Sequence, residues 1–107
     1  MASTDYVVVN ELGRLMKEDS GVTLIDARTP EEFDEGHIPG AINVPIVDLA
    51  EFAKKLSSTS DPLLVTMCGS SGRGAKAAAI LDSHGVKNIL ILDGGLKAWK
   101  DAGLPVA

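Results

Sequence analysis

The sequence is poor in cysteine, in aromatic residues and in long apolar runs. Its only cysteine is Cys68, so no disulfide can form within the chain, which fits a reducing compartment. No apolar run approaches the roughly 20 residues that a membrane-spanning helix needs. Residues 1–10 have neither a basic start nor a small-residue cleavage site, so no secretion signal is expected. These absences predict a cytoplasmic protein that does not enter a membrane.

Basic residues are also in the minority. The chain has 10 Lys and Arg against 15 Asp and Glu, and its formal net charge is −5. It contains no cluster of Lys or Arg that could neutralise a phosphate backbone, so we expect no nucleic-acid partner. If the substrate is a small anion, the overall charge repels it, and local groups must attract it.

Metal ligands and nucleotide-binding motifs are scarce as well. The soft or imidazole ligands Cys68, His37 and His84 lie far apart in sequence, so no metal is expected. His37 is better interpreted as a hydrogen-bonding pin of the turn at 36–40, and His84 as a surface residue near a helix end. The glycines at 69–74 lack the Lys-Ser/Thr pair of a phosphate-binding loop, and Ala77 stands where a dinucleotide motif has its third glycine. We therefore expect no cofactor.

What the sequence does contain is an alternation of β-type and amphipathic helical segments. Its 107 residues are enough for one domain, which we expect to span residues 1–107. The expected strands cover residues 6–9, 22–25, 41–44, 63–67 and 88–92. Helices are expected after each strand, several of them closed by glycine. This alternation predicts an α/β fold with a mainly parallel sheet of about five short strands.

Local signals predict where several helices begin and how they pack. Asn10 is a candidate N-cap for the first helix, which Gly21 should end. Thr29 should cap the second, with Pro30 in its first position and Glu32 completing a capping box. Phe33 is the expected core anchor of that helix. A later helix over 74–84 is rich in alanine, so it can lie close to the sheet.

The segment 63–76 has the features of a reactive site. An apolar, β-branched run ends at Cys68, a loop of glycine and serine follows, and the alanine-rich helix begins directly afterwards. Free N–H groups at a helix N-terminus stabilise anions, and a thiolate is such an anion. We expect the pKa of the Cys68 thiol to fall from about 8.5 into the range of roughly 3.5 to 7.5. Cys68 is then a nucleophile, and the residues expected to bind its substrate are Gly69, Ser70, Ser71, Gly72 and Arg73.

A lone cysteine at the end of a buried strand also has a simpler explanation. Free cysteine is among the most buried residue types and often serves only as a small apolar filler. A filler does not need several glycines around it, however, and glycine at that density costs conformational entropy on folding. The composition of the loop therefore favours the nucleophile.

Other polar residues follow the expected strands directly. Asp26, Arg28 and Asp93 do so, as Cys68 does, and the carboxyl ends of parallel strands share one edge of a sheet. We expect Asp26 and Arg28 to form an ion pair that supports this edge, in preference to contacting a substrate. Arg73 has two options: it can face the thiolate and an anionic substrate, or fold back onto a carboxylate such as Asp26.

Two long segments resemble the signatures of the rhodanese family. Residues 24–33 read LIDARTPEEF and residues 36–45 read GHIPGAINVP, and together they are similar to the family's N-terminal signature. Residues 92–99, LDGGLKAW, with GLPV at 103–106, resemble its C-terminal signature. Cys68 stands where the family has its catalytic cysteine.

The resemblance implies a three-layer α/β domain, with helices on both faces of the sheet, and a single-domain sulfurtransferase. In this family the cysteine takes the outer sulfur of a donor such as thiosulfate, becomes a persulfide, and passes the sulfur to cyanide or a thiol. Cys68 and Arg73 enclose four residues, whereas the loops of related phosphatases and arsenate reductases enclose five, which favours sulfur transfer. Two alternatives are a relay that passes sulfur to an acceptor protein and a non-catalytic binding or regulatory module.

Overall fold

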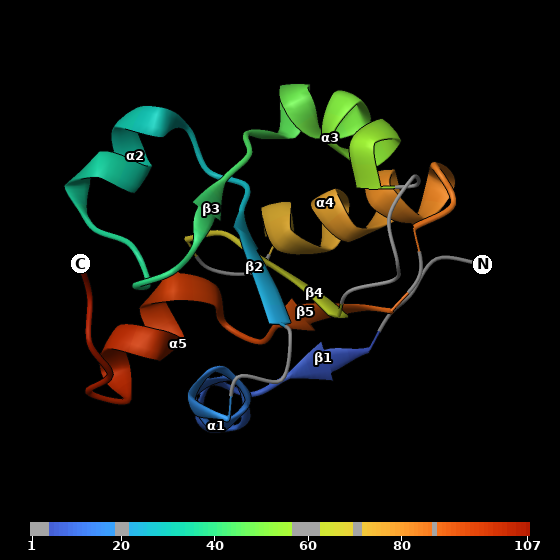
Figure 1. The fold of residues 1–107 in the computed structure, drawn as a ribbon. Coiled ribbons are helices and arrows are strands. Elements are labelled where there is room, and N and C mark those ends of the chain that lie inside the picture. The colour runs from blue at the N-terminus through green and yellow to red at the C-terminus, as the bar shows by residue number, and fades with distance from the viewer. Residues whose placement is uncertain (1–4, 19–21, 57–62, 70–71, 87) are drawn as a thin grey trace.

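The computed structural model describes residues 5–18, 22–56, 63–69, 72–86 and 88–107. Within these residues a parallel sheet has the strand order β1-β5-β4-β2-β3 (Figure 1). Its strands are β1 (Tyr6–Val7), β2 (Val22–Asp26), β3 (Ile42–Asn43), β4 (Leu63–Met67) and β5 (Ile89–Leu92). The predicted α/β fold with a parallel sheet is confirmed.

Helices cover both faces of this sheet. They are α1 (Val9–Lys17), α2 (Pro30–Glu35), α3 (Leu49–Leu56), α4 (Gly72–Ser83) and α5 (Gly95–Asp101), and a short 3-10 turn, η1 (Ile46–Asp48), precedes α3. Helices α3 and α4 lie on one face, and α1 and α5 lie on the other (Figure 1). Each pair encloses its own buried cluster, one including Leu49 and Leu81 and the other including Leu12 and Trp99. The three predicted layers are therefore present.

Strand β4 occupies the centre of the sheet and ends at the candidate site. Its residues from Leu64 onward are buried, as expected for a parallel strand covered on both faces. The register pairs Asp26 of β2 with Met67 of β4, and the backbone N–H of Ala27 donates to the Met67 carbonyl at 2.9 Å. The carboxyl ends of these two strands consequently lie side by side, at the edge where parallel sheets form their sites.

Helix α4 lies very close to β4 because its first turns carry small residues. A Cβ atom added to Gly74 would stand 3.4 Å from the Cα of Met67, in van der Waals contact with the strand backbone. The Thr66 hydroxyl donates to the Gly74 carbonyl at 2.8 Å and ties the helix to the strand. The helix begins at Gly72 rather than at residue 74 as predicted, so its N-terminus lies nearer to the end of β4.

Two local predictions are wrong. Asn10 lies inside α1, whose N-cap is Val8 without a side-chain hydrogen bond, because the helix begins almost directly after β1 ends. Phe33 is not a core anchor: α2 has no buried residue, and the Phe33 ring stacks on His37 with centroids 3.8 Å apart. A helix at the periphery of the fold has no core to fill. The predicted end of the first helix at Gly21 lies outside the described residues.

Other local predictions hold. Thr29 and Glu32 form the capping box, with Thr29 Oγ1 accepting from the Glu32 backbone N–H at 3.2 Å. His37 is the expected pin of its turn, because its Nδ1 lies 2.9 Å from the Phe33 carbonyl oxygen. His84 is exposed near the end of α4, as expected.

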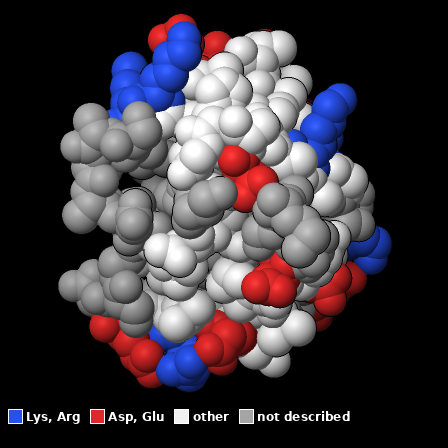
Figure 2. Space-filling model, turned by 90° about the vertical axis from the view of Figure 1, so that its right-hand side faces the viewer, with Lys and Arg blue, Asp and Glu red and all other residues white. Residues whose placement is uncertain are grey.

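Charged side chains of both signs are mixed on the face that Figure 2 shows. Among the described residues of that face, basic and acidic side chains form small groups that are spread around the edge of the view. The described helices are all too short or too polar to cross a lipid bilayer.

Candidate active site

Cys68 follows β4 directly and is held there by α5. Its carbonyl oxygen accepts a hydrogen bond from the Leu96 N–H at 2.8 Å, and the Gly69 carbonyl accepts one from Lys97 at 3.0 Å. Both donors belong to the first turn of α5, where backbone N–H groups have no partner within their own helix. The loop therefore supplies the acceptors that this helix start lacks, and the helix start in turn orients the loop.

This anchoring determines which way the first peptide of the loop faces. In a trans peptide the carbonyl oxygen and the following N–H point in opposite directions. Since the Cys68 carbonyl points at α5, the N–H of Gly69 points away from α5. Helix α4 begins at Gly72, so the positive end of its dipole lies four residues along the chain from Cys68. Ser70 and Ser71, two of the predicted substrate-binding residues, lie outside the described residues.

The sulfur of Cys68 is not freely exposed. The residue is 2% exposed, and it is free of any disulfide. Burial alone is equally compatible with a packing cysteine, so the orientation of the loop and the helix ends around it carries the functional argument.

Arg73 pairs with Glu32, a residue that the sequence reasoning did not connect with the site. The guanidinium donates from Nη1 to Glu32 Oε1 at 2.8 Å and from Nη2 to Oε2 at 3.1 Å. This two-pronged contact, with a backbone hydrogen bond from Thr29 as the next cause, lowers the pKa of Glu32 to about 2. Asp26 was therefore the wrong example of a carboxylate partner. The acidic side chain of Glu32 in the capping box of α2 was the feature of the sequence that could have indicated this partner.

Arg73 nevertheless remains close to the loop that follows Cys68. Its Nη2 lies 3.9 Å from the position that a Cβ on Gly69 would take. The pKa of Arg73 is raised mainly by its hydrogen bond to Glu32, with smaller contributions from the charges of Cys68 and Asp26. The positive charge is thus oriented by Glu32 and still acts on the loop that carries the sulfur.

Asp26 and Arg28 form the predicted ion pair below the site. Arg28 Nη2 donates to Asp26 Oδ2 at 2.8 Å and to the Gly36 carbonyl at 2.7 Å, and its Nε donates to Asp26 Oδ1 at 3.0 Å. The Asp26 side chain is fully buried, and that of Arg28 is 7% exposed. Both side chains are therefore shielded from solvent and bound to each other.

Asp93, also predicted at this edge, is exposed at the end of β5. Its backbone N–H donates to the Val7 carbonyl at 2.9 Å, which joins it to the edge strand β1. No group of three His, Cys, Asp or Glu side chains within the described part of the chain is placed to hold a metal ion.

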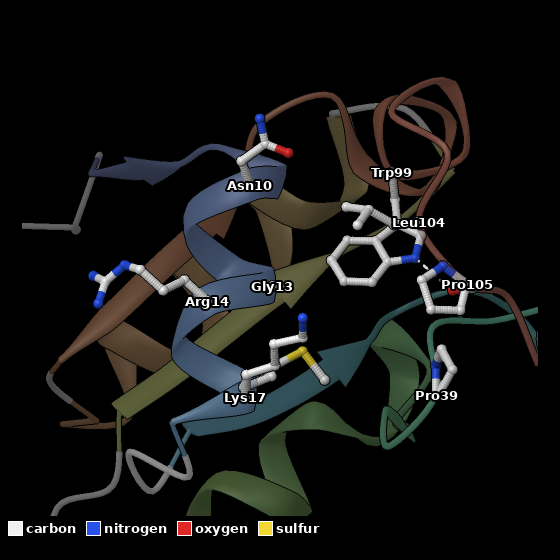
Figure 3. Close-up of a pocket in the computed structure, with 9 residues that line it drawn as sticks. Asn10, Gly13, Arg14, Lys17, Pro39, Trp99, Leu104 and Pro105 are labelled. Carbon is white, nitrogen blue, oxygen red and sulfur yellow. Dashed lines mark hydrogen bonds between the residues drawn. The ribbon is translucent and has the colours of Figure 1, made fainter.

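Two hollows lie near these elements, and they differ in their relation to Cys68. A pocket of about 510 Å³ lies between α1 and the C-terminal segment, and Trp99, held by its hydrogen bond to the Pro105 carbonyl at 2.7 Å, forms one wall (Figure 3). It is lined by neither Cys68 nor Arg73. A second hollow of about 390 Å³ is lined by both Ala27 and Arg73, which border the Cys68 loop. Cys68 itself lines neither hollow, and the second one is related to the Cys68 loop through Ala27 and Arg73.

The chain matches a known family over most of its length. A family model described as a rhodanese-like domain matches residues 8–102. The chain is 34% identical to the thiosulfate sulfurtransferase GlpE of Shewanella oneidensis over 102 residues, covering 95% of this chain and 98% of that protein. A rhodanese-related protein of Thermoplasma volcanium has a similar structure, with a TM-score of 0.83 at 31% identity, covering 96% of this chain and 97% of that one.

Some relatives are considerably longer. An HTH-type transcriptional regulator of Mycobacterium tuberculosis is 39% identical over 95 residues, which cover 84% of this chain. This chain spans 39% of the length of that regulator, and 56% and 32% of two other curated relatives. The same kind of domain therefore occurs within proteins of different size.

Proposed function

The chain belongs to the rhodanese-like domain family, and on this premise we propose that it is a sulfurtransferase whose nucleophile is Cys68. The Cys68 thiolate attacks the outer sulfur of a donor such as thiosulfate. The sulfur–sulfur bond of the donor breaks, sulfite leaves with the electron pair, and Cys68 carries a persulfide. Cyanide or a thiolate then attacks the outer sulfur, and the Cys68 thiolate is regenerated.

One observation carries this proposal: the chain's only thiol stands in a loop held between two helix starts. The N–H groups of α5 hold the carbonyls of Cys68 and Gly69, which leaves the Gly69 N–H directed away from α5. The N-terminus of α4 adds further donors at Gly72. Such preoriented donors stabilise a thiolate, a persulfide anion and a departing sulfite alike.

The residues proposed to bind the donor are those of the loop. Backbone N–H groups would come from Gly69 and Gly72. The sequence predicts the same role for Ser70 and Ser71, which lie between them. Arg73 would attract the anionic donor, against the net charge of −5, from its position beside Gly69. Asp26 and Arg28 would act through support of the strand ends, because both are buried.

The persulfide itself provides the test. The protein is incubated with thiosulfate and its intact mass is measured before and after addition of cyanide. We expect the mass of one added sulfur, which cyanide removes with formation of thiocyanate. Cys68→Ser should gain no sulfur and show no turnover. Turnover by that variant would exclude the proposal.

A non-catalytic regulatory role is the second candidate, because a transcriptional regulator is among the relatives. The presence of Cys68 in this chain favours sulfur transfer over that role. Folded protein that gains no sulfur from thiosulfate would favour the regulatory role.

We also propose that residues 1–107 act as one domain in a reducing compartment such as the cytoplasm. The Cα radius of gyration of 12.6 Å is close to the roughly 13 Å of a compact domain of this length. The single free cysteine fits the compartment.

A further inference from the structure

The hollow beside the Cys68 loop, here called the acceptor groove, is built from three segments. Ala27 and Arg73 form its inner end, the start of α2 forms one side, and the turn at 45–48 forms the other. We propose that the acceptor groove receives a cysteine of a partner protein, carried on a segment of apolar and Lys or Arg residues, as the acceptor of sulfur from Cys68. This inference rests on the proposed function and names the acceptor that the site selects.

The inner end of the groove adjoins the sulfur-bearing loop. The Ala27 N–H is bonded to the carbonyl of Met67, the residue directly before Cys68, at 2.9 Å. Arg73 ends the loop, with its guanidinium beside Gly69. A chain lying in the groove therefore contacts Ala27 and Arg73, the two lining residues that adjoin the loop of Cys68.

The rim of the groove presents an apolar side chain to solvent. Val47 is 88% exposed, the greatest exposure among the large hydrophobic residues of the described chain. It belongs to η1, which is held by a hydrogen bond from the Asp48 N–H to the Pro45 carbonyl at 2.8 Å and by Ile46 packing against the core. A valine held out on a rigid turn is suited to contact with an apolar residue of a partner.

The rim is also negatively charged on both sides. Glu31 on α2 and Asp48 on η1 are exposed, and neither forms an ion pair with any residue that the structure describes. The positive charge of Arg73 is already matched by Glu32. Two free carboxylates repel anionic acceptors and attract cationic segments, and such complementarity acts on both encounter rate and specificity.

The transfer step needs no additional reactant. The partner thiol loses its proton to solvent, and its thiolate attacks the outer sulfur of the Cys68 persulfide. A new sulfur–sulfur bond forms on the partner while the bond to Cys68 breaks, and its electron pair returns to the Cys68 sulfur. The partner leaves as a persulfide.

Two matched peptides test the inference. Protein loaded with thiosulfate is first discharged with cyanide, which measures persulfide formation independently of the groove. Loaded protein is then mixed at low ionic strength with an acetylated Lys-Leu-Cys-Leu-Lys amide or with its Glu-Leu-Cys-Leu-Glu counterpart. Each transfer rate is divided by the rate at which that peptide reduces a small aromatic disulfide, so that differences in thiol reactivity cancel.

We expect the lysine peptide to accept sulfur at least about tenfold faster, with the preference shrinking as salt screens the charges. The double variant Glu31→Lys/Asp48→Lys should abolish or invert the preference. Asp34→Lys/Glu35→Lys changes the net charge equally on exposed positions of α2 outside the groove, and should retain it. Val47→Ser should slow transfer to both peptides.

The outcomes separate the two proposals. If thiosulfate leaves no persulfide for cyanide to discharge, the proposed function fails, and the acceptor inference fails with it. If the persulfide forms and cyanide discharges it, yet wild type treats the peptides alike or Glu31→Lys/Asp48→Lys keeps the wild-type preference, the acceptor inference alone is overturned.

Discussion

At the scale of single residues, two ion pairs near Cys68 have different surroundings and therefore different tasks. The pair of Arg73 and Glu32 is 41% and 39% exposed, so water screens it and its main effect is to orient a charge. The pair of Asp26 and Arg28 is buried, so the attraction between the two charges must offset the hydration that each of them loses. One pair positions a cation beside the loop, and the other supports the strand ends beneath it.

Arg73→Ala should weaken donor binding more than catalysis. The positive charge beside Gly69 is lost while the loop anchors on α5 remain, so we expect KM for thiosulfate to rise more than kcat falls. Steady-state kinetics measure both constants. Arg14→Ala is the matched control, because it removes an exposed arginine that pairs with Glu11 and Glu18 on α1. A fall in the melting temperature without a change in KM would assign Arg73 to the fold.

The stability contributed by Glu32 should depend on pH. Its pKa in the folded protein is about 2, below the ordinary value of 4.5, so the ion pair stabilises the protein above about pH 5 and is lost as the pH falls toward 2. Glu32→Gln keeps a side chain that can form the capping box but removes the charge. We expect it to lower stability at pH 6 by under about 1 kcal/mol. Urea melts from pH 6 to pH 2.5 should show this difference shrinking; a constant difference would contradict the assignment.

Asp26→Ala should be far more damaging than the loss of an exposed partner. In this variant the buried Arg28 guanidinium loses the Asp26 carboxylate and keeps its hydrogen bond to the Gly36 carbonyl. Breaking such a buried pair costs about 3–5 kcal/mol. Glu11→Ala breaks an exposed pair with Arg14, which water screens, and should change stability far less. Equilibrium urea denaturation measures both. Equal effects would mean that the Asp26 pair does not support the edge of the sheet.

At the scale of elements, the site is made where three of them end or begin. Strand β4 ends at Met67, directly before Cys68, α4 begins at Gly72, and the start of α5 bonds to the loop between them. Gly94, the N-cap of α5, allows the start of this helix to reach the loop. It has a φ of +79°, and a Cβ on it would stand 2.5 Å from the Cβ of Ala98. Glycine is therefore required where the chain turns from β5 into α5.

Gly94→Ala should displace α5 from the loop. Left-handed strain and the overlap with Ala98 together should cost about 2–4 kcal/mol, and sulfur transfer should fall with the displaced anchors of Cys68. Gly103→Ala is the control at the other end of the helix, because Gly103 has a φ of +76° with nothing within 4 Å of its added Cβ. Backbone strain alone, about 1 kcal/mol, is expected there. Urea melts and thiosulfate turnover would be compared; equal losses in both variants would contradict the steric account.

At the scale of the whole molecule, the parallel sheet joins two separate buried clusters. Leu81 on α4 belongs to one and Trp99 on α5 to the other, and β4 contributes residues to both. A shared sheet should make the two faces unfold together, as small single domains do.

Leu81→Ala tests this coupling. The substitution creates a cavity beneath α4 and should cost about 2–5 kcal/mol. Fluorescence of Trp99, the chain's only tryptophan, reports on the opposite face, and far-UV circular dichroism reports on all helices. The two probes should give one coincident urea transition, shifted equally by the variant. Separate transitions would show that the faces unfold independently.

Local signals along the chain were sufficient to predict the alternation of strands and helices and the capping box at Thr29, and they also indicate Cys68 as a candidate nucleophile. These features arise from local periodicity, cap chemistry and glycine content, which neighbouring residues specify. The predictions for Asn10 and Phe33 were wrong because N-caps and core anchors also depend on where a helix lies in the fold. Helix α1 begins before Asn10, and α2, which carries Phe33, lies at the periphery.

The contacts between distant residues near the loop follow from the folded arrangement and could not be predicted from local signals. Glu32 lies 41 positions from Arg73, and Leu96 donates to Cys68 across the next strand. No spacing rule links such residues, because their contacts follow from the strand order β1-β5-β4-β2-β3 and the packing of helices upon it. The acceptor groove has the same origin, since its walls come from α2, η1 and α4, which the chain brings together only when folded.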